Sequence, residues 1–374
     1  MASKSTLELR QQVGQLLIMG CGGTTMSARL RSMLGTLHPG GVILFQRNIE
    51  EAAQTHALLR DVQKAVSTSL FLCVDMEGGT VDRLRDVIAP APAVAEVAAA
   101  GSKKLFRKHG RIIGAEVRAL GFNTDFAPAL DLQLEPSKSV LTSRTVSADP
   151  KETIQYAREF LRGLSDCKIL GCGKHFPGLG EANLDSHNDL PLIDKAWKRL
   201  WNEDLLPYRE LRRNLPFVMV AHAAYPQVTD DLTPASLSKK WMSEVLRKKI
   251  GYRGLIITDD LDMGGVLAAA SIEDVAVETL RAGAEMFLVC QKEESVWRAF
   301  EAVYKQAEND KKFAKLIAGK ARQVLAAKKK SRALKSRMAA AATQKTVDKL
   351  RRNIWEFSEE VRMHTMAAGE VAGC

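Results

Sequence analysis

The sequence has little cysteine and no long uninterrupted apolar run, and both absences narrow the classes of protein to which it can belong. Six cysteines in 374 residues are too few for a fold held together by disulfide bonds. No apolar run reaches the roughly 18 residues that a membrane-spanning helix needs. The opening segment MASKSTLELRQQVGQ lacks the apolar core of a secretory signal. We therefore expect a cytoplasmic protein without stable membrane insertion.

Several short motifs of phosphate, metal and serine-hydrolase sites are also absent. The GCGG segment at 20–23 lacks the Lys-Ser/Thr pair of a phosphate-binding loop and the spacing of a dinucleotide-binding fingerprint. The sequence contains neither an HExxH nor a GxSxG motif. The cysteines show no zinc-ligand spacing. We therefore expect no metal site.

The charge is unevenly distributed along an otherwise ordinary globular composition. Hydrophobic residues make up 46% and charged residues 26% of the chain, which excludes a disordered or fibrous protein. The net charge of +10 comes from residues 311–374, which hold 16 Lys and Arg against 5 Asp and Glu, whereas residues 1–310 hold 38 against 39. We expect a main domain over 1–310 and a helical extension over 311–374, packed on or near it with a solvated basic face. Nucleic acid is not an expected partner.

Eight apolar runs alternate with segments that are compatible with helices, a pattern typical of βα units with a parallel sheet. Their continuous apolar character fits strands that are covered on both faces. Helix-compatible segments between them include 102–120, 154–164 and 237–249. The pattern predicts an α/β fold, a (β/α)8 TIM-type barrel with extra C-terminal helices. A doubly wound open sheet is the alternative, but it usually has fewer strands. The runs are 15–20, 41–45, 70–75, 122–131, 169–175, 217–222, 254–260 and 285–290.

Polar residues end five of these runs. The catalytic residues of a TIM-type barrel come from the carboxyl ends of several strands, so we expect these side chains to meet at one mouth. Carboxylates, histidines and arginines without metal-ligand spacing suit acid–base chemistry on a hydroxyl-rich ligand. The residues that end the runs are Asp75, Asp131, Lys174 with His175, His222, and Asp259 with Asp260.

Six segments in a fixed order resemble the family 3 glycoside hydrolases, in particular their single-barrel β-N-acetylglucosaminidases. They are GGVILFQRNI, VDMEGGTVDRL, NTDFAPALD, the KHFPG loop with its DSH, AHAAYP and ITDDL, and the resemblance extends from about residue 10 to 292. It implies a retaining exo-β-N-acetylglucosaminidase that needs no metal or organic cofactor. It further implies a small saccharide or muropeptide substrate and a role in bacterial peptidoglycan recycling.

The resemblance implies three catalytic residues. Asp259 occupies the position of the family's nucleophile, and a carboxylate fixed at a strand end can attack an anomeric carbon. His187, on the KHFPG loop, occupies the position of the general acid/base, with Asp185 as its partner. A histidine can give and take a proton near neutral pH, and a nearby carboxylate stabilises its charged form.

A second set of residues matches the positions at which the family holds the sugar. Carboxylates and cationic donors are suited to vicinal hydroxyls, and Arg144 is a candidate for the side of the acetamido group. We expect Asp131 and His222 to support this set rather than to touch the substrate. The sugar-binding residues implied by the resemblance are Asp75, Arg83, Arg144, Lys174 and His175.

The sequence departs from the family pattern at a few positions. Thr80 stands in place of a common Arg, Met76 in place of a Gln, Leu179 in place of a second His, and Glu181 with Ala182 in place of Asp-Thr. These departures bear on leaving-group preference and on the loop.

The sequence leaves other functions open. The alternatives are a phosphorylase of the same family, a broader β-glycosidase, and a non-catalytic binder of saccharides or acidic polymers that uses the basic extension. The oligomeric state stays open.

Overall fold

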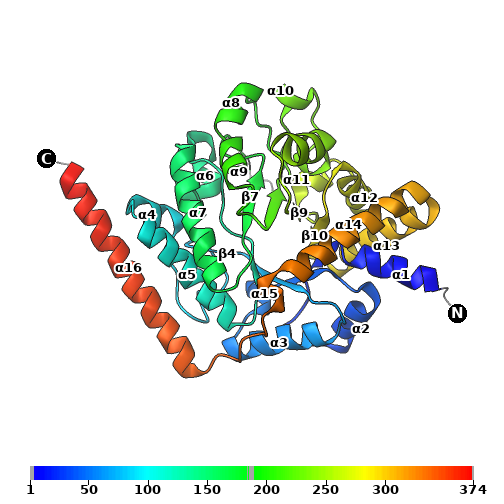
Figure 1. Ribbon diagram of the computed structural model, residues 1–374, viewed down its shortest axis with the longest axis horizontal. Helices are drawn as coiled ribbons and strands as arrows, with labels where there is room; N and C mark the ends of the chain where they lie inside the picture. The colour runs from blue at the N-terminus through cyan, green and yellow to red at the C-terminus, as the bar shows by residue number, and fades with distance from the viewer. Residues whose placement is uncertain (1–3, 183, 185–188, 373–374) are drawn as a thin grey trace.

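Eight parallel strands form one sheet in a computed structural model that describes residues 4–182, 184 and 189–372. The strand order is β6-β3-β2-β1-β10-β9-β8-β7. Every strand overlaps one of the eight predicted runs, and the sheet is nearly closed into a ring with helices around it (Figure 1). The predicted (β/α)8 barrel is therefore confirmed. The strands are β1 (Leu17–Met19), β2 (Gly41–Ile43), β3 (Phe71–Val74), β6 (Thr124–Asp125), β7 (Cys172–Phe176), β8 (Phe217–Val220), β9 (Leu255–Asp260) and β10 (Met286–Val289).

The ring closes between β6 and β7 with less regular pairing than elsewhere. Two isolated parallel bridges, Thr124 with Leu170 and Ala129 with Lys174, join the two segments. Irregular backbone hydrogen bonds accompany the bridges, including one from the Cys172 amide to the Ala127 carbonyl at 2.8 Å. We call this junction the β6–β7 seam.

Helices cover the outside of the barrel because each buries one apolar stripe against it. In α7 (Pro150–Asp166) the buried residues Ile154, Ala157, Phe160, Leu161 and Leu164 recur every three or four positions. Asp149 caps the start of this helix, because its carboxylate accepts a hydrogen bond from the Lys151 amide. The other helices of the body are α1 (Lys4–Gly14), α2 (Ala28–Leu37), α3 (Ala52–Lys64), α4 (Val94–Ala99), α5 (Lys103–Ala119), α6 (Lys138–Leu141), α8 (Trp197–Asn202), α9 (Leu205–Leu211), α10 (Pro226–Thr229), η5 (Lys240–Lys249), α11 (Gly264–Leu267), α12 (Ile272–Ala282) and α13 (Glu293–Asn309).

Two long helices follow α13 and pack on different parts of the body. In α14 (Lys311–Lys330) Phe313, Ile317 and Val324 are buried, and the short helix α15 (Arg332–Lys335) follows it. The last helix, α16 (Gln344–Ala372), runs along the outer side of α4 and α5 (Figure 1). Its buried residues Leu350 and Phe357 belong to the same apolar core as the barrel. The expected division at residue 310 stays a prediction.

The basic face of α14 differs in part from the expected solvated face. Lys311, Lys312 and Lys329 are exposed, but Lys320 and Lys328 are buried. The Lys328 ammonium donates to Gln15 Oε1 at 2.8 Å. Because these two lysines share the helix stripe that packs on the barrel, their aliphatic stems add to the buried contact. Along the part of the chain that the structure describes, no helix combines the length and apolar character needed to cross a membrane.

Candidate active site

A two-stranded hairpin extends β3 and places two carboxylates at the carboxyl end of the barrel. It consists of β4 (Met76–Gly78) and β5 (Val81–Asp82). Gly78, at φ +87°, lies so close to the backbone at Pro92 that an added Cβ would be 2.3 Å from the Pro92 carbonyl oxygen. This tight turn folds the hairpin back, so that Asp75 is half-buried and the side chain of Glu77 is fully buried.

Glu77 and Asp75 form an ion network with two cations from other segments. The Arg144 guanidinium donates from Nε and Nη2 to the two Glu77 oxygens at 2.9 and 2.8 Å. Lys174 Nζ lies 2.7 Å from Glu77 Oε1 and 2.8 Å from Asp75 Oδ1. The side chain of Lys174 is 3% exposed and that of Arg144 is 16% exposed. We call these four residues the Glu77 network.

The pKa directions of Glu77 and Lys174 agree with an ionised Glu77 and a charged Lys174. Burial raises the pKa of Glu77, but the charges and hydrogen bonds of Arg144 and Lys174 outweigh it and hold that pKa far below its usual range. Burial lowers the pKa of Lys174, whereas Asp75 and Glu77 raise it, and the net shift is upward. Two carboxylates and two cations thus balance in a region from which most water is excluded.

His175 is held by Asp131 across the β6–β7 seam. Its Nδ1 lies 2.7 Å from Asp131 Oδ2, and its backbone amide donates to the same oxygen at 3.2 Å. Asp131 Oδ1 accepts a further hydrogen bond from the Leu179 amide at 2.7 Å. The Lys174–His175 peptide bond is cis. Asp131 therefore orients the imidazole and also fixes the start of the segment that follows β7.

Asp259 and Asp260 end β9, and their environments differ. Burial raises the pKa of Asp259, but the charges of His175 and His222 lower it, and the net shift is downward. Burial raises the pKa of Asp260 to about 6. Asp260 Oδ1 accepts from the amides of Asp262 and Cys290 at 3.0 and 2.9 Å. Asp259 is therefore the half-buried carboxylate of the pair with the lower pKa, whereas the Asp260 side chain accepts hydrogen bonds from backbone amides.

His222, at the end of β8, is buried beside β9. Its Nε2 lies 3.0 Å from the Asp260 carbonyl oxygen and its Nδ1 lies 2.7 Å from Ser236 Oγ. Because a carbonyl oxygen only accepts, Nε2 is the donor to Asp260, whereas the Ser236 hydroxyl can pair with Nδ1 as donor or as acceptor. This arrangement fixes the ring next to Asp259.

A buried lysine anchors the segment after β7. The side chain of Lys195 is fully buried and makes ion pairs with Asp204 at 2.6 Å, Glu203 at 2.7 Å and Glu181 at 3.4 Å. An added Cβ on Gly178 would lie 2.8 Å from the Asp204 Cβ. Lys195 and its three carboxylate partners therefore hold residues 178–181 against the turn between α8 and α9.

The structure brings together four of the five residues expected to hold the sugar: Asp75, Arg144 and Lys174 in the Glu77 network, and His175 next in the chain to Lys174. Arg83 follows β5, and its buried Nε has no hydrogen-bond partner among the described residues. His187 and Asp185 lie outside the described residues. These site assignments stay predictions.

Sequence reasoning missed Glu77 as a site residue. It lies two positions after Asp75, a spacing that places side chains on one face of an extended segment, and this signal was available in VDMEGG. Within residues 4–182, 184 and 189–372, no group of three or more His, Cys, Asp or Glu is arranged to hold a metal ion.

Comparison with known proteins gives the family. The glycosyl hydrolase family 3 N-terminal domain matches residues 8–327. A beta-hexosaminidase of Bordetella avium is 39% identical over 265 residues, which cover 68% of this chain and 75% of the relative. A beta-hexosaminidase of Pseudomonas aeruginosa is 36% identical over 288 residues, or 77% of this chain and 86% of the relative.

Solved structures give the same result. A family 3 beta-N-acetylglucosaminidase from Paenibacillus sp. superposes with a TM-score of 0.87 at 32% identity, and the match covers 94% of this chain and 68% of that one. NagZ from Neisseria gonorrhoeae superposes with a TM-score of 0.74 at 25% identity, over 94% and 97% of the two chains. The chain therefore belongs to glycosyl hydrolase family 3 and is a glycoside hydrolase.

Proposed function

We propose that the protein is a retaining exo-β-N-acetylhexosaminidase that removes terminal β-linked N-acetylglucosamine. The observation that carries this proposal is Asp259, a carboxylate at the end of β9 whose pKa is held below its usual range by His175 and His222. A nucleophilic carboxylate must be ionised at the working pH. The names of the relatives, beta-hexosaminidase and beta-N-acetylglucosaminidase, support the choice of sugar.

The reaction proceeds in two displacements at the anomeric carbon. Asp259 attacks this carbon while its bond to the leaving oxygen breaks, and His187 donates a proton to that oxygen. The product of this step is a glycosyl ester of Asp259. Water then attacks the same carbon, His187 takes a proton from the water, and the Asp259 carboxylate leaves. Asp185 orients the His187 ring and stabilises its charged form in the first step.

The Glu77 network and His175 hold the sugar while this happens. Asp75 supplies a carboxylate acceptor, and Lys174 and Arg144 supply donors, which together match the paired donor and acceptor character of vicinal hydroxyls. Because Glu77 and Asp131 fix these groups before substrate arrives, little free energy is lost in ordering them. In this proposal Arg144 serves the side of the acetamido group, and Arg83 is the fifth sugar-binding residue.

The natural substrate in this proposal is a muropeptide fragment, and the compartment is the cytoplasm. The support is the resemblance to the single-barrel N-acetylglucosaminidases. In this setting the enzyme releases N-acetylglucosamine from an anhydro-muramic sugar during peptidoglycan recycling.

The test is hydrolysis of 4-nitrophenyl β-N-acetylglucosaminide by the wild type and by Asp259→Asn. We expect a loss of at least 1,000-fold in kcat/KM for Asp259→Asn, because removing a nucleophile removes more than about 4 kcal/mol of transition-state stabilisation. Asp230→Asn, at an exposed turn after α10, is the matched control and should keep wild-type activity. Equal activity of Asp259→Asn and Asp230→Asn would refute the assignment of the nucleophile.

Two further readouts separate the finer parts of the proposal. Proton NMR of the first product gives the β-anomer for a retaining enzyme and the α-anomer for an inverting one. Turnover in phosphate buffer gives free sugar for a hydrolase and a sugar 1-phosphate for a phosphorylase. Comparable kcat/KM on a glucoside without the acetamido group would replace the present choice of substrate with a broader β-glycosidase.

A further inference from the structure

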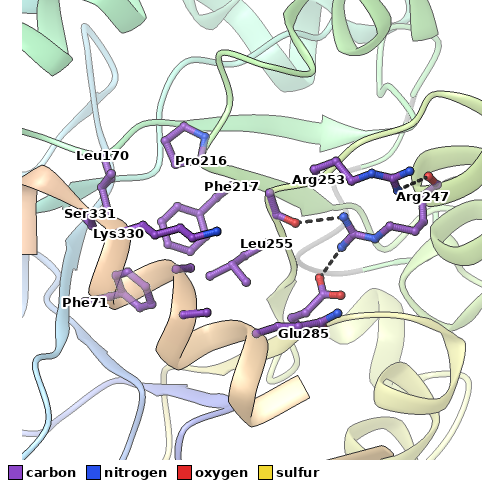
Figure 2. Close-up of a pocket in the computed structure, with 14 residues that line it drawn as sticks. Phe71, Leu170, Pro216, Phe217, Arg247, Arg253, Leu255, Glu285, Lys330 and Ser331 are labelled. Carbon is purple, nitrogen blue, oxygen red and sulfur yellow. Dashed lines mark hydrogen bonds and ion pairs between the residues drawn. The ribbon is translucent and has the colours of Figure 1, made fainter. Parts of the chain in front are cut away.

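A cavity of about 540 Å³ lies at the end of the barrel where the strands begin, opposite the end that carries Asp259. Phe71, Phe217 and Leu255 stand at the first positions of β3, β8 and β9, and α14 closes the other side (Figure 2). The volume lies in the range of about 300–1,000 Å³ typical of small-molecule sites. The proposed hydrolysis uses none of these residues, so the cavity needs an explanation of its own.

The floor of the cavity is apolar. The rings of Phe71 and Phe217 meet edge to face with their centroids 5.0 Å apart. Leu170, Pro216 and Leu255 extend this surface. An apolar ligand placed here would take its own hydrophobic surface out of water, which favours binding by about 25 cal/mol for each Å².

The rim of the cavity is positively charged, and its one acidic residue is already paired. Glu285 lies 2.7 Å from Arg247 Nη2 and also accepts from the Ile256 amide at 2.8 Å. Lys330 and Arg253 are exposed and have no carboxylate partner among the described residues. Figure 2 shows the Lys330 side chain reaching over the apolar floor, while Arg247 is held by Glu285 and by backbone oxygens.

The helix that closes the cavity also carries two buried lysines. Lys320 and Lys328 are buried on the side of α14 that packs on the barrel. The Lys328 ammonium lies 5.2 Å from the centroid of the Phe71 ring, which lines the cavity. Lys330 and Arg253 therefore line an apolar floor without carboxylate partners of their own, and the one lining carboxylate, Glu285, is paired with Arg247. This combination matches a ligand that is apolar at one end and anionic at the other.

We propose that this cavity binds a small amphipathic anion, a carboxylate carried on an acyl or aryl body. The apolar body rests on Phe71, Phe217 and Leu255, and the carboxylate pairs with Lys330, with Arg253 nearby on the rim. The basic character of residues 311–330 then has a specific use, because α14 supplies both the cover of the cavity and the cation that recognises the ligand.

The test is calorimetric titration of the full chain with sodium octanoate, octanamide and sodium acetate. Octanamide keeps the apolar body without the charge, and acetate keeps the charge without the apolar body. We expect saturable binding of octanoate at one site, with octanamide and acetate at least tenfold weaker. No measurable octanoate binding, or octanamide binding as tightly as octanoate, would overturn the proposal.

Two pairs of variants locate the site. Lys330→Glu should weaken octanoate binding at least tenfold, whereas Lys329→Glu, an exposed neighbour that does not line the cavity, should leave it unchanged. Ala326→Trp fills the cavity from α14 and should abolish binding, whereas Leu325→Trp faces away from this cavity and should not. Wild-type hydrolysis by all four variants shows that they fold. Equal weakening in both members of either pair would place the octanoate elsewhere and refute the site.

Discussion

Two buried glutamates, Glu77 and Glu116, allow a sharp test of how charge is arranged around the active site. The side chain of Glu77 is fully buried and ionised between Arg144 and Lys174. Glu116, in α5, is equally buried, but neither of its carboxyl oxygens has a hydrogen-bond partner in the described part of the chain. Burial, and then the charges of Asp82 and Asp125, raise its pKa well above the usual range. Burial therefore favours the neutral, protonated form of Glu116.

We predict that Glu77→Gln is severe and that Glu116→Gln is nearly silent. The first change leaves Arg144 and Lys174 with only Asp75 to balance them, and breaking a buried ion pair costs about 3–5 kcal/mol. The second replaces a neutral acid with a neutral amide of the same shape, so the free energy of unfolding should change by less than about 1 kcal/mol. For activity we expect a roughly 100-fold lower kcat/KM in Glu77→Gln, since the sugar-binding groups lose their fixed positions.

Urea denaturation and hydrolysis of 4-nitrophenyl β-N-acetylglucosaminide measure the two effects. The pH dependence gives a further check. Because the pKa of Glu77 in the folded protein lies below its ordinary value of 4.5, its contribution to stability is complete above that value and is lost as the pH falls below it. The stability difference between wild type and Glu77→Gln should therefore shrink in acid. Equal stability of Glu77→Gln and Glu116→Gln at pH 7 would refute this account of the network.

Two more predictions concern buried lysines. Burial lowers the pKa of Lys328 from 10.5 to about 7. The unfolded chain therefore binds more protons than the folded one between these two values, so the stability of the wild type should rise with pH across this range. In urea denaturation Lys328→Met should be more stable than the wild type at pH 7 by about 1–3 kcal/mol and should show less of this rise. Lys195→Met leaves Glu181, Glu203 and Asp204 without their buried cation, so it should lose about 3 kcal/mol of stability and at least tenfold in kcat/KM. An unchanged pH profile in Lys328→Met, or wild-type activity in Lys195→Met, would contradict these assignments.

The barrel could be predicted from the sequence because its signal is spread over the whole chain. Each of eight apolar runs gives a strand, and the segments between them are long enough for helices. The predicted helix at 237–249 begins at Lys240 and is a wide π-type helix, η5. This detail depends on how the segment packs between its neighbours, so periodicity alone does not give it.

The parts that could not be predicted depend on burial of polar side chains. In VDMEGG, Glu77 is consistent with an ordinary turn, and only the folding of the hairpin against Arg144 and Lys174 shows that it is enclosed. The burial of Lys320 and Lys328, by contrast, could have been predicted. They share a helical stripe with Ile317 and Val324 at spacings of three and four, so the sequence held a signal that a count of charges did not use.

Asp131 has a second role at the β6–β7 seam, besides orienting His175. Its carboxylate receives hydrogen bonds from the His175 backbone amide and from Leu179, and it also contacts the His175 ring. Isolated bridges and irregular backbone hydrogen bonds join β6 and β7. The side chain that positions an active-site group therefore also helps to close the ring. Active sites usually gain function at the expense of stability. At this seam the two requirements coincide, so random mutation followed by selection for thermal stability alone should preserve Asp131.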